Sequence, residues 1–250
     1  MSELDGAAAV VTGAGRGLGR GIALSLAGRG ARVAALDVDA GGADETAQLI
    51  QRAGGTAWPA RVDVTDEAEV GAGIAGAAAQ FGGLDLVVNG AGVLSVAHVV
   101  DLEAAEWRRV LEVNVTGAFL VSRAAARVMI TAARPASIIS IASVAGKVGE
   151  PGLAHYAASK FALVGFTQAL ARELAPHQIT VNAVCPGVVL TQMIEEVASK
   201  WRMSIDDLLD MQAIHRPQTP DDIALAIAFL HASRSVTGQA INVDGGTVFS

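Results

Sequence analysis

The chain has a single cysteine, and aromatic residues make up only 4% of its 250 residues. One cysteine cannot form an internal disulfide, so we expect a protein of a reducing compartment and predict a cytoplasmic location. Charged residues are also scarce, at 17% against the roughly 25% usual in soluble domains. No run approaches the roughly 18 uninterrupted apolar residues of a membrane-spanning helix, and the acidic start is unlike a signal peptide, so we expect no membrane partner.

The sequence is also short of positive charge and of histidines in metal-binding patterns, which bears on its binding partners. The 18 Lys and Arg residues are outnumbered by 25 Asp and Glu residues, and the resulting net charge of −7 disfavours nucleic acid as a partner. The five histidines show no metal-ligand spacing, so we predict no metal site. Hydrophobic residues, in contrast, make up 52% of the chain, which predicts a large core and a buried surface between subunits.

Short apolar segments alternate with segments of helical spacing along the whole chain. The first pair is a strand at Ala7–Thr12 and a helix at Gly17–Ala27, and the last strand is Ala240–Val243. Strands without polar alternation, separated by helices, are typical of a parallel sheet covered on both faces. We therefore predict a single α/β domain over residues 1–250, with a doubly wound Rossmann-type sheet that binds ligands at the carboxyl ends of its strands.

Residues 191–217 interrupt this alternation between two late strands. The segment is long for a connection, and insertions of this kind often close over a binding site. We predict a substrate lid here, with Trp201 as the tryptophan that contacts the site.

A glycine-rich loop, Thr12–Gly19, follows the first predicted strand. Its spacing is T-G-x-x-x-G-x-G, through Gly13, Gly17 and Gly19, rather than G-x-G-x-x-G. Glycines let the backbone approach a pyrophosphate, and the following helix offers free N–H groups and the positive end of its dipole. The loop predicts a dinucleotide site; a flexible surface loop is the alternative, because 28 residues of the chain are glycine.

Asp37 ends the second predicted strand, where an acid commonly binds the adenosine ribose hydroxyls. A carboxylate about 4 Å from the 2′-phosphate of NADP would oppose its binding by about 4 kcal/mol at an effective dielectric constant of about 20. Arg16 in the glycine loop could instead attract that phosphate, and Asp39 is a nearby competitor for the ribose. Asp37 could also be an ordinary turn residue. We give Asp37 more weight and predict NAD as the cofactor.

The only tyrosine, Tyr156, lies four residues before Lys160, so the two side chains share one helical face. An ammonium group so close is expected to stabilise the phenolate and lower the tyrosine pKa from about 10. Tyr156 would then serve as an acid or base nearer neutral pH. A surface Tyr–Lys pair is the alternative, but here a loop containing Ser140 and Ser143 precedes the helix.

Taken in order, these motifs resemble the short-chain dehydrogenase/reductase family over essentially the whole chain. The matching residues are Thr12–Gly19, Asp63, Val64, Asn89, Gly90, Ala91, Gly92, Asn114, Ser143, Tyr156, Lys160, Pro186, Gly187 and the residues through Thr191. The resemblance implies an oxidoreductase that moves hydride between a nicotinamide and an alcohol or carbonyl carbon. Gly90 departs from the family, since many relatives have a second asparagine there.

The same resemblance implies catalytic roles. Tyr156 would take the hydroxyl proton during oxidation, and Lys160 would keep it acidic while bonding the nicotinamide ribose. Ser143 would hydrogen-bond the reacting oxygen. Asn114 would position a water that links Lys160 to solvent, and its place within a helical pattern predicts a local kink.

Cofactor contacts and assembly follow from the resemblance as well. The implied contacts are Gly13, Arg16, Gly17, Leu18, Gly19, Asp37, Asp63, Val64, Asn89, Ala91, Gly92, Tyr156, Lys160, Pro186, Gly187, Val189 and Thr191. Residues 63–64 would flank the adenine, residues 89–92 would pass beside the ribose, and residues 186–191 would hold the nicotinamide end. Relatives commonly form homotetramers through the two helices predicted at Val115–Ile130 and Phe161–Leu174, so we expect a homotetramer.

The substrate is the least determined feature. Ser143 and Tyr156 would contact it, and Glu150 would accept hydrogen bonds from extra hydroxyls unless it is a solvated loop acid. Residues 146–149 and 237–243 are similar to those of polyol and acetoin/butanediol enzymes, so we predict a small neutral secondary alcohol or polyol and its ketone. The alternatives are an NADPH-dependent 3-oxoacyl-thioester reductase and a non-catalytic dinucleotide-sensing regulator on the same fold.

Overall fold

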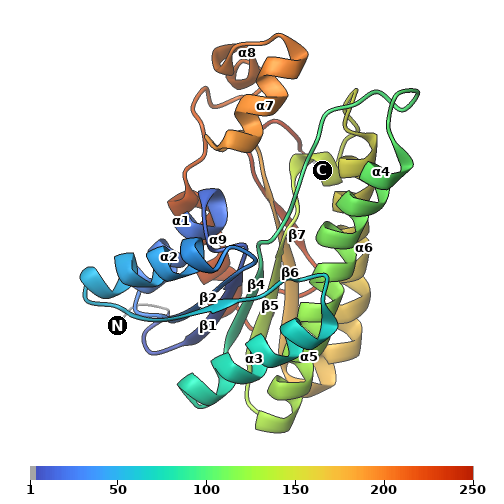
Figure 1. The fold of residues 1–250 in the computed structure, drawn as a ribbon. Coiled ribbons are helices and arrows are strands. Elements are labelled where there is room, and N and C mark those ends of the chain that lie inside the picture. Colours follow the sequence, from blue (N-terminus) through green and yellow to red (C-terminus); the bar gives the residue numbers. More distant parts are fainter. Residues whose placement is uncertain (1–3, 250) are drawn as a thin grey trace.

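A computed structural model describes residues 4–249, which form a parallel sheet of seven strands between two layers of helices (Figure 1). The strands are β1 (Ala8–Thr12), β2 (Arg32–Asp37), β3 (Thr56–Arg61), β4 (Leu86–Asn89), β5 (Ala136–Ile141), β6 (Ile179–Pro186) and β7 (Ala240–Val243). Their order in the sheet is β3-β2-β1-β4-β5-β6-β7, and every neighbouring pair is parallel. The predicted doubly wound Rossmann-type sheet is confirmed. Its strand order reverses between β1 and β4, where such sheets bind ligands.

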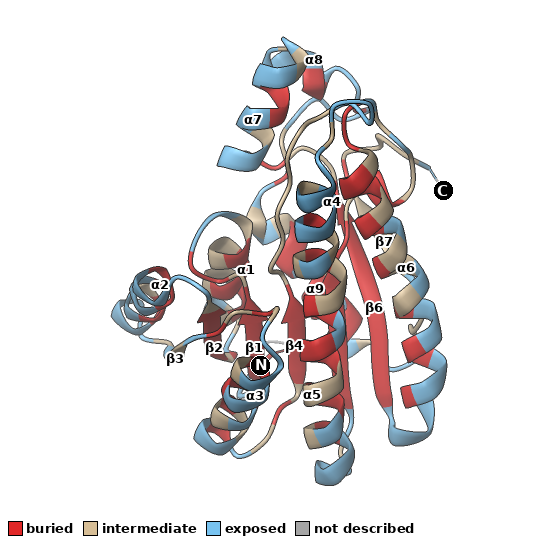
Figure 2. Cartoon of the chain, turned by 45° about the vertical axis from the view of Figure 1, so that its right-hand side comes forward, coloured by how far each residue is buried: buried red, intermediate tan, exposed pale blue. Residues whose placement is uncertain are grey.

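Helices cover both faces of this sheet. They are α1 (Gly17–Gly28), α2 (Ala40–Arg52), α3 (Glu67–Phe81), α4 (Ala104–Leu111), α5 (Gly117–Ala132), α6 (Ala154–Leu174), α7 (Gln192–Trp201), α8 (Ile205–Leu209) and α9 (Pro220–Ala232). Apolar residues of α3, α5 and α6 pack on one face, and those of α1, α2 and α9 pack on the other. The strands β1, β4, β5 and β6 are buried along their whole length, whereas the edge strands β3 and β7 are only partly covered. The outer faces of the helices meet solvent (Figure 2).

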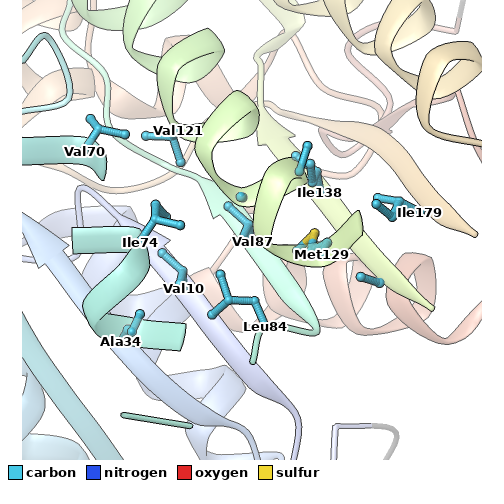
Figure 3. Close-up of a cluster of buried hydrophobic side chains, with 14 of the residues drawn as sticks. Val10, Ala34, Val70, Ile74, Leu84, Val87, Val121, Met129, Ile138 and Ile179 are labelled. Carbon is cyan, nitrogen blue, oxygen red and sulfur yellow. The ribbon is translucent and has the colours of Figure 1, made fainter. Parts of the chain in front are cut away.

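The core on the first face shows why the apolar runs became strands. Val10 and Val87 of β1 and β4 project toward Ile74 of α3, and Ile138 of β5 lies near Met129 of α5 (Figure 3). These side chains have no exposed surface beyond 1%. Burying each aliphatic side chain fully stabilises the fold by roughly 1.5–3 kcal/mol relative to leaving it exposed. This burial outweighs the local helix preference of the residues in the strands.

Polar residues mark where the helices begin. The Asp66 carboxylate accepts hydrogen bonds from the backbone N–H groups of Ala68 and Glu69, at 2.8 and 3.0 Å, and starts α3. Thr219 and Asp222 form a reciprocal capping box at the start of α9, with Pro220 in its first turn. Such caps satisfy N–H groups that have no partner within the helix.

The segment from Ala104 to Ala132 forms one helical stretch with a distortion in the middle. A π-helical turn, η1 (Glu112–Thr116), separates α4 from α5 and contains Asn114, so the predicted irregularity at this residue takes the form of a π turn. By length and composition alone this stretch could cross a membrane, with a mean hydropathy of 1.3 over its most apolar part. Of that part, 44% is buried inside the fold, and a single helix of this kind is weak evidence for a membrane span.

A buried histidine makes the stability of the fold depend on pH. His231 of α9 is only 6% exposed, and its Nδ1 lies 3.2 Å from the Ser137 hydroxyl of β5. Burial lowers the pKa of His231 to about 4, from 6.5. The unfolded chain therefore binds a proton that the folded chain rejects, and stability is lost as the pH falls below 6.5 toward about 4. At pH 5 the loss from this residue is about 2 kcal/mol.

The variant His231→Gln should remove this contribution, since glutamine can bond Ser137 but never gains a charge. We expect the difference in unfolding free energy between pH 7.5 and pH 5.0 to shrink by about 2 kcal/mol relative to the wild type. Urea denaturation at both pH values measures it. An identical pH dependence in the two proteins would contradict the assignment.

Candidate active site

A cavity of about 960 Å³ opens at the carboxyl ends of the strands. Gly13 follows β1, Asp37 ends β2, Gly90 follows β4, Ser143 follows β5 and Gly187 follows β6, and all five line the cavity. Because parallel strands end at one edge of the sheet, residues far apart in the sequence meet here.

The glycine loop contributes the floor of the cavity between β1 and α1. Gly13 and Gly17 have φ angles of +69° and +53°, in the left-handed region that favours glycine. A Cβ atom on Gly19 would lie 2.0 Å from the Gly13 carbonyl oxygen, so only glycine fits there. The loop therefore leaves open backbone that a pyrophosphate can approach, and α1 directs its first N–H groups toward it.

Gly19→Ala should abolish most dinucleotide binding, because the added methyl group would displace the backbone of Gly13. We expect the NADH affinity to fall at least about tenfold. The melting temperature should also fall, because the close packing of the Gly13 and Gly19 backbones is disrupted. NADH fluorescence titration and thermal unfolding measure the two effects.

The same helix supplies the control for this variant. A Cβ atom on Gly28, at the end of α1, would meet nothing within 4 Å. Gly28→Ala should therefore keep the NADH affinity and leave stability equal or raise it by up to about 1 kcal/mol. Equal NADH affinity in both variants and the wild type would show that the loop does not bind the dinucleotide.

Asp37 is held in place by the loop that it faces. One of its carboxylate oxygens accepts the backbone N–H of Gly15 at 2.7 Å, and the other accepts that of Asp39 at 2.9 Å. A Cβ atom on Gly15 would lie 2.7 Å from the Asp37 carboxyl carbon, so a side chain there would push the carboxylate out of this position. Each oxygen keeps a lone pair that can accept a ribose hydroxyl. Asp37 and Arg16 both line the cavity, whereas Asp39 does not.

Ser143, Tyr156 and Lys160 lie together on the opposite wall. Ser143 begins the short helical turn η2 (Val144–Gly146), and Tyr156 and Lys160 occupy adjacent turns of α6. The Tyr156 hydroxyl is hydrogen-bonded to Ser143, and the Lys160 Nζ atom lies 5.5 Å from the centre of the tyrosine ring. Lys160 also donates to the carbonyl of Ile141 at 2.8 Å. A phenol, a hydroxyl and an amine thus share one end of the cavity.

The predicted lowering of the Tyr156 pKa is wrong for this structure. Burial raises the pKa of Tyr156 to about 12, although the hydrogen bond with Ser143 acts in the opposite direction. Burial also lowers the pKa of Lys160 to about 8. Sequence spacing places an amine beside a phenol, but both groups are more than 90% buried, and the cost of desolvating their charged forms dominates. Tyr156 is therefore a protonated phenol at neutral pH.

Asn114 lies behind this group rather than on the cavity wall. Its side chain exchanges two hydrogen bonds with the backbone of Val93, at 2.8 and 3.0 Å, and donates to the Ser159 hydroxyl at 3.0 Å. A Cβ atom on Gly92 would lie 3.4 Å from Asn114 Oδ1 and 3.6 Å from Lys160 Nζ. Asn114 and Lys160 therefore flank the same glycine, and the proposed role in positioning a water stays a prediction.

The structure brings most predicted contacts to the cavity. Those that line it are Gly13, Arg16, Gly17, Leu18, Gly19, Asp37, Asp63, Val64, Ala91, Gly92, Ser143, Glu150, Tyr156, Lys160, Pro186, Gly187, Val189 and Thr191. Asn89 does not: its amide donates to the hydroxyls of Ser122 and Ser140, at 2.9 and 3.2 Å, in the interior. Its strand alternation directs the side chain away from the cavity.

The segment 191–217 covers one side of the cavity, with α7 and α8 standing above the sheet (Figure 2). Trp201 lines the cavity, packs in a small apolar cluster with Leu153 and Tyr156, and donates its indole N–H to the Pro151 carbonyl at 3.2 Å. The sequence prediction did not identify the wall residues Leu94, Arg109, Glu112 and Leu153. It included Met193, Glu196, Val197, Leu208 and Met211 only as part of the predicted lid. The methionines of the predicted lid were the available signal, whereas nothing in the sequence marked α4 as a wall.

Fold and site together define a dinucleotide-binding α/β protein with a Ser–Tyr–Lys group at the sheet edge. A family model described as short chain dehydrogenase matches residues 7–201. The chain is 36% identical to the (3R)-3-hydroxyacyl-CoA dehydrogenase of Homo sapiens, over 98% of this chain and 97% of that protein. It is 39% identical to the 2-(S)-hydroxypropyl-CoM dehydrogenase 3 of Xanthobacter autotrophicus, over 94% of each. The crystal structure of a short-chain type dehydrogenase/reductase from Mycobacterium marinum matches with a TM-score of 0.91 at 36% identity, covering 98% of this chain and 96% of that chain.

The chain belongs to the short-chain dehydrogenase/reductase family. It is therefore an oxidoreductase of CH–OH groups that uses a nicotinamide dinucleotide and acts on small molecules. The residues present suit such a cofactor. The glycines before α1 leave the backbone N–H groups accessible to a pyrophosphate, and the nearby Asp37 carboxylate has lone pairs free to accept ribose hydroxyls.

Proposed function

We propose that the protein is an NAD(H)-dependent oxidoreductase that interconverts a small neutral secondary alcohol and its ketone. The observation that carries this proposal is the position of Ser143, Tyr156 and Lys160 at one end of a cavity whose other end contains the glycine loop and Asp37. NAD, when bound, supplies the carbon that accepts the hydride. The chain supplies the proton transfer and the orientation of the alcohol.

During oxidation the substrate oxygen lies between the hydroxyls of Ser143 and Tyr156. The Tyr156 oxygen, as phenolate, takes the hydroxyl proton, and Ser143 donates to the reacting oxygen and stabilises its developing charge. In the reverse direction Tyr156 donates its proton to the ketone oxygen. Because the pKa of Tyr156 is raised to about 12, reduction should proceed at neutral pH and oxidation should become faster in alkaline solution.

The charges around the cavity support a neutral substrate. Glu112, Glu150 and Glu196 line it, and among residues 4–249 the Arg and Lys side chains on its wall are Arg16, Arg109 and Lys160. Arg109 is paired through two hydrogen bonds with Glu106, so its charge is offset. The apolar lining residues of α7 and α8 favour a secondary alcohol with an aliphatic substituent over a polyol.

A 3-hydroxyacyl-thioester substrate is a second candidate, favoured by the similarity to a (3R)-3-hydroxyacyl-CoA dehydrogenase. Assaying a panel of secondary alcohols, polyols, ketones and 3-oxoacyl thioesters with both NAD and NADP separates the candidates. We expect the highest kcat/KM for a neutral secondary alcohol with NAD. Turnover of thioesters alone, or with NADP alone, would overturn the proposal, and absence of all turnover would support a non-catalytic sensor.

The proposal includes a cytoplasmic homotetramer. Phe119 of α5 and Phe161 of α6 are 41% and 47% exposed, and Ile130 is 36% exposed. Large apolar side chains on two neighbouring helices are the kind of surface that subunits bury against one another. Light scattering should give a mass near four times 25.4 kDa.

A further inference from the structure

A chain of polar side chains connects α6 to the cavity wall without passing through Tyr156. His155 precedes Tyr156 and is completely buried, and its Nε2 lies 2.9 Å from the hydroxyl of Ser95. Ser95 also lies close enough to the carboxylate of Glu106 on α4 for its hydroxyl to help lower the pKa of Glu106. Glu106 accepts two hydrogen bonds from Arg109, from Nε and from Nη2, both at 2.7 Å. Arg109 lines the cavity, whereas His155, Ser95 and Glu106 do not.

The direction of the hydrogen bonds in this chain follows from its members. Ser95 has one proton, and the carboxylate of Glu106 can only accept, so Ser95 donates to Glu106. This arrangement suits the neutral tautomer of His155 that has its proton on Nε2 and donates it to Ser95. Its Nδ1 atom is buried and has no hydrogen-bond partner among residues 4–249, consistent with a bare nitrogen. Burial lowers the pKa of His155, which keeps the ring neutral.

The far end of the chain is an arginine with unused donors. Both donors that Arg109 directs at Glu106 come from one side of the guanidinium, and its Nη1 forms no hydrogen bond with the part of the chain that the structure describes. The side chain of Arg109 is 47% exposed, so it is not a core residue. An exposed arginine normally samples many rotamers, and fixing one has an entropic cost. Here the two hydrogen bonds with Glu106 hold the guanidinium of a residue that lines the cavity.

The location and charge of this donor point to the substrate end of the cavity. Arg109 lies near enough to Glu196, a cavity residue of α7, for that carboxylate to contribute to raising the pKa of Arg109. Figure 1 shows α4 and α7 standing apart at the carboxyl edge of the sheet. Because Glu106 offsets the charge of Arg109 and Glu196 adds a negative charge, the site suits an uncharged acceptor such as a carbonyl better than an anion.

We propose that Arg109 is a specificity residue that binds a second, uncharged oxygen group of the substrate, and that Glu106, Ser95 and His155 are its positioning residues. The substrate class is then a secondary alcohol with a carbonyl or ether oxygen further along its chain, such as a hydroxy ester or hydroxy ketone. The proposal rests on the proposed alcohol dehydrogenase activity.

The test compares kcat/KM for methyl 3-hydroxybutanoate and butan-2-ol, which differ in the second oxygen group. We expect the wild type to prefer the ester at least about tenfold, the discrimination that one hydrogen bond commonly gives. Arg109→Met should reduce this ratio to below about threefold, because it removes the donors and keeps the aliphatic stem. Ser95→Ala should reduce the ratio by a smaller factor, since it breaks the chain but keeps Arg109. The 3-hydroxybutanoate anion should be a poorer substrate than its ester.

Arg108→Met is the matched control, because Arg108 is the neighbouring exposed arginine of α4 and does not line the cavity. It should leave the ratio unchanged. Equal losses on both substrates in Arg109→Met, a wild type that prefers butan-2-ol, or a preference for the anion would overturn the inference while the proposed function stands. Turnover of none of the alcohols would instead refute the proposed function. Melting temperatures show whether each variant is folded. If Arg109→Met does not fold, Ser95→Ala still tests the proposal.

Discussion

Tyr156→Phe should lower kcat for alcohol oxidation by a factor on the order of 1,000 while NADH still binds. The substitution removes one oxygen atom, the proposed acid–base group beside Ser143. General acid–base catalysis commonly contributes a factor of about 100 to 10,000. The ring itself packs with Ala145 and Leu153, and phenylalanine keeps those contacts. Steady-state kinetics and NADH fluorescence titration measure the two quantities.

The pH profile serves as an internal control for this variant. Oxidation by the wild type should rise with pH, because burial raises the pKa of Tyr156 to about 12 and the phenolate is the active base. Residual oxidation by Tyr156→Phe should lack that rise. A variant that keeps more than a tenth of wild-type turnover would show that another group transfers the proton.

Asp37→Asn should reduce the preference for NAD over NADP, expressed as a ratio of kcat/KM values, by a factor of about 100. The Asp37 carboxylate ends β2 at the cavity. A unit charge about 4 Å from the 2′-phosphate would oppose binding by about 4 kcal/mol at an effective dielectric constant of about 20, and this energy corresponds to more than a hundredfold change in affinity. Solvent at the cavity mouth screens part of that repulsion. Asparagine has almost the same shape but can accept only one of the two backbone N–H groups that the carboxylate accepts, so thermal unfolding of the variant is measured alongside.

Asp39→Asn provides the matched control for the cofactor prediction. Asp39 is exposed, does not line the cavity, and makes no side-chain cap at the start of α2. Its substitution should change the ratio less than about threefold, as expected for a screened surface charge. A wild type that prefers NADP, or equal effects of the two substitutions, would assign the 2′-phosphate site to Arg16 and overturn the role of Asp37.

The sequence predicted the sheet because its information is local. Apolar runs without alternation can become only buried strands when they are this short, and the glycines of Thr12–Gly19 mark the turn between strand and helix. The hydrogen bond between the Gly15 backbone and the Asp37 carboxylate could not be predicted from the sequence pattern, because the two loops meet only in the folded chain. Asn89 was assigned to the cavity from its place in a motif, but the direction of its side chain depends on the strand.

Helical spacing correctly placed Lys160 beside Tyr156, yet it could not give their pKa values. Spacing determines which side chains are neighbours, whereas the depth of burial depends on β5, β6 and the turn at η2, which surround them. The same reason hid Arg109, whose role depends on Ser95 and His155 from other segments. Short-range patterns thus identify the reacting groups, and tertiary packing sets their charge state.

The most direct test of the account follows a deuterium atom from the substrate to the cofactor. The wild-type protein is given NAD and a secondary alcohol deuterated at its carbinol carbon, and the mass of the NADH formed is measured. The account predicts that the label appears in the nicotinamide ring in proportion to the ketone formed, and that Tyr156→Phe transfers it far more slowly. Ketone formed with unlabelled NADH, or transfer at the wild-type rate in Tyr156→Phe, would contradict it.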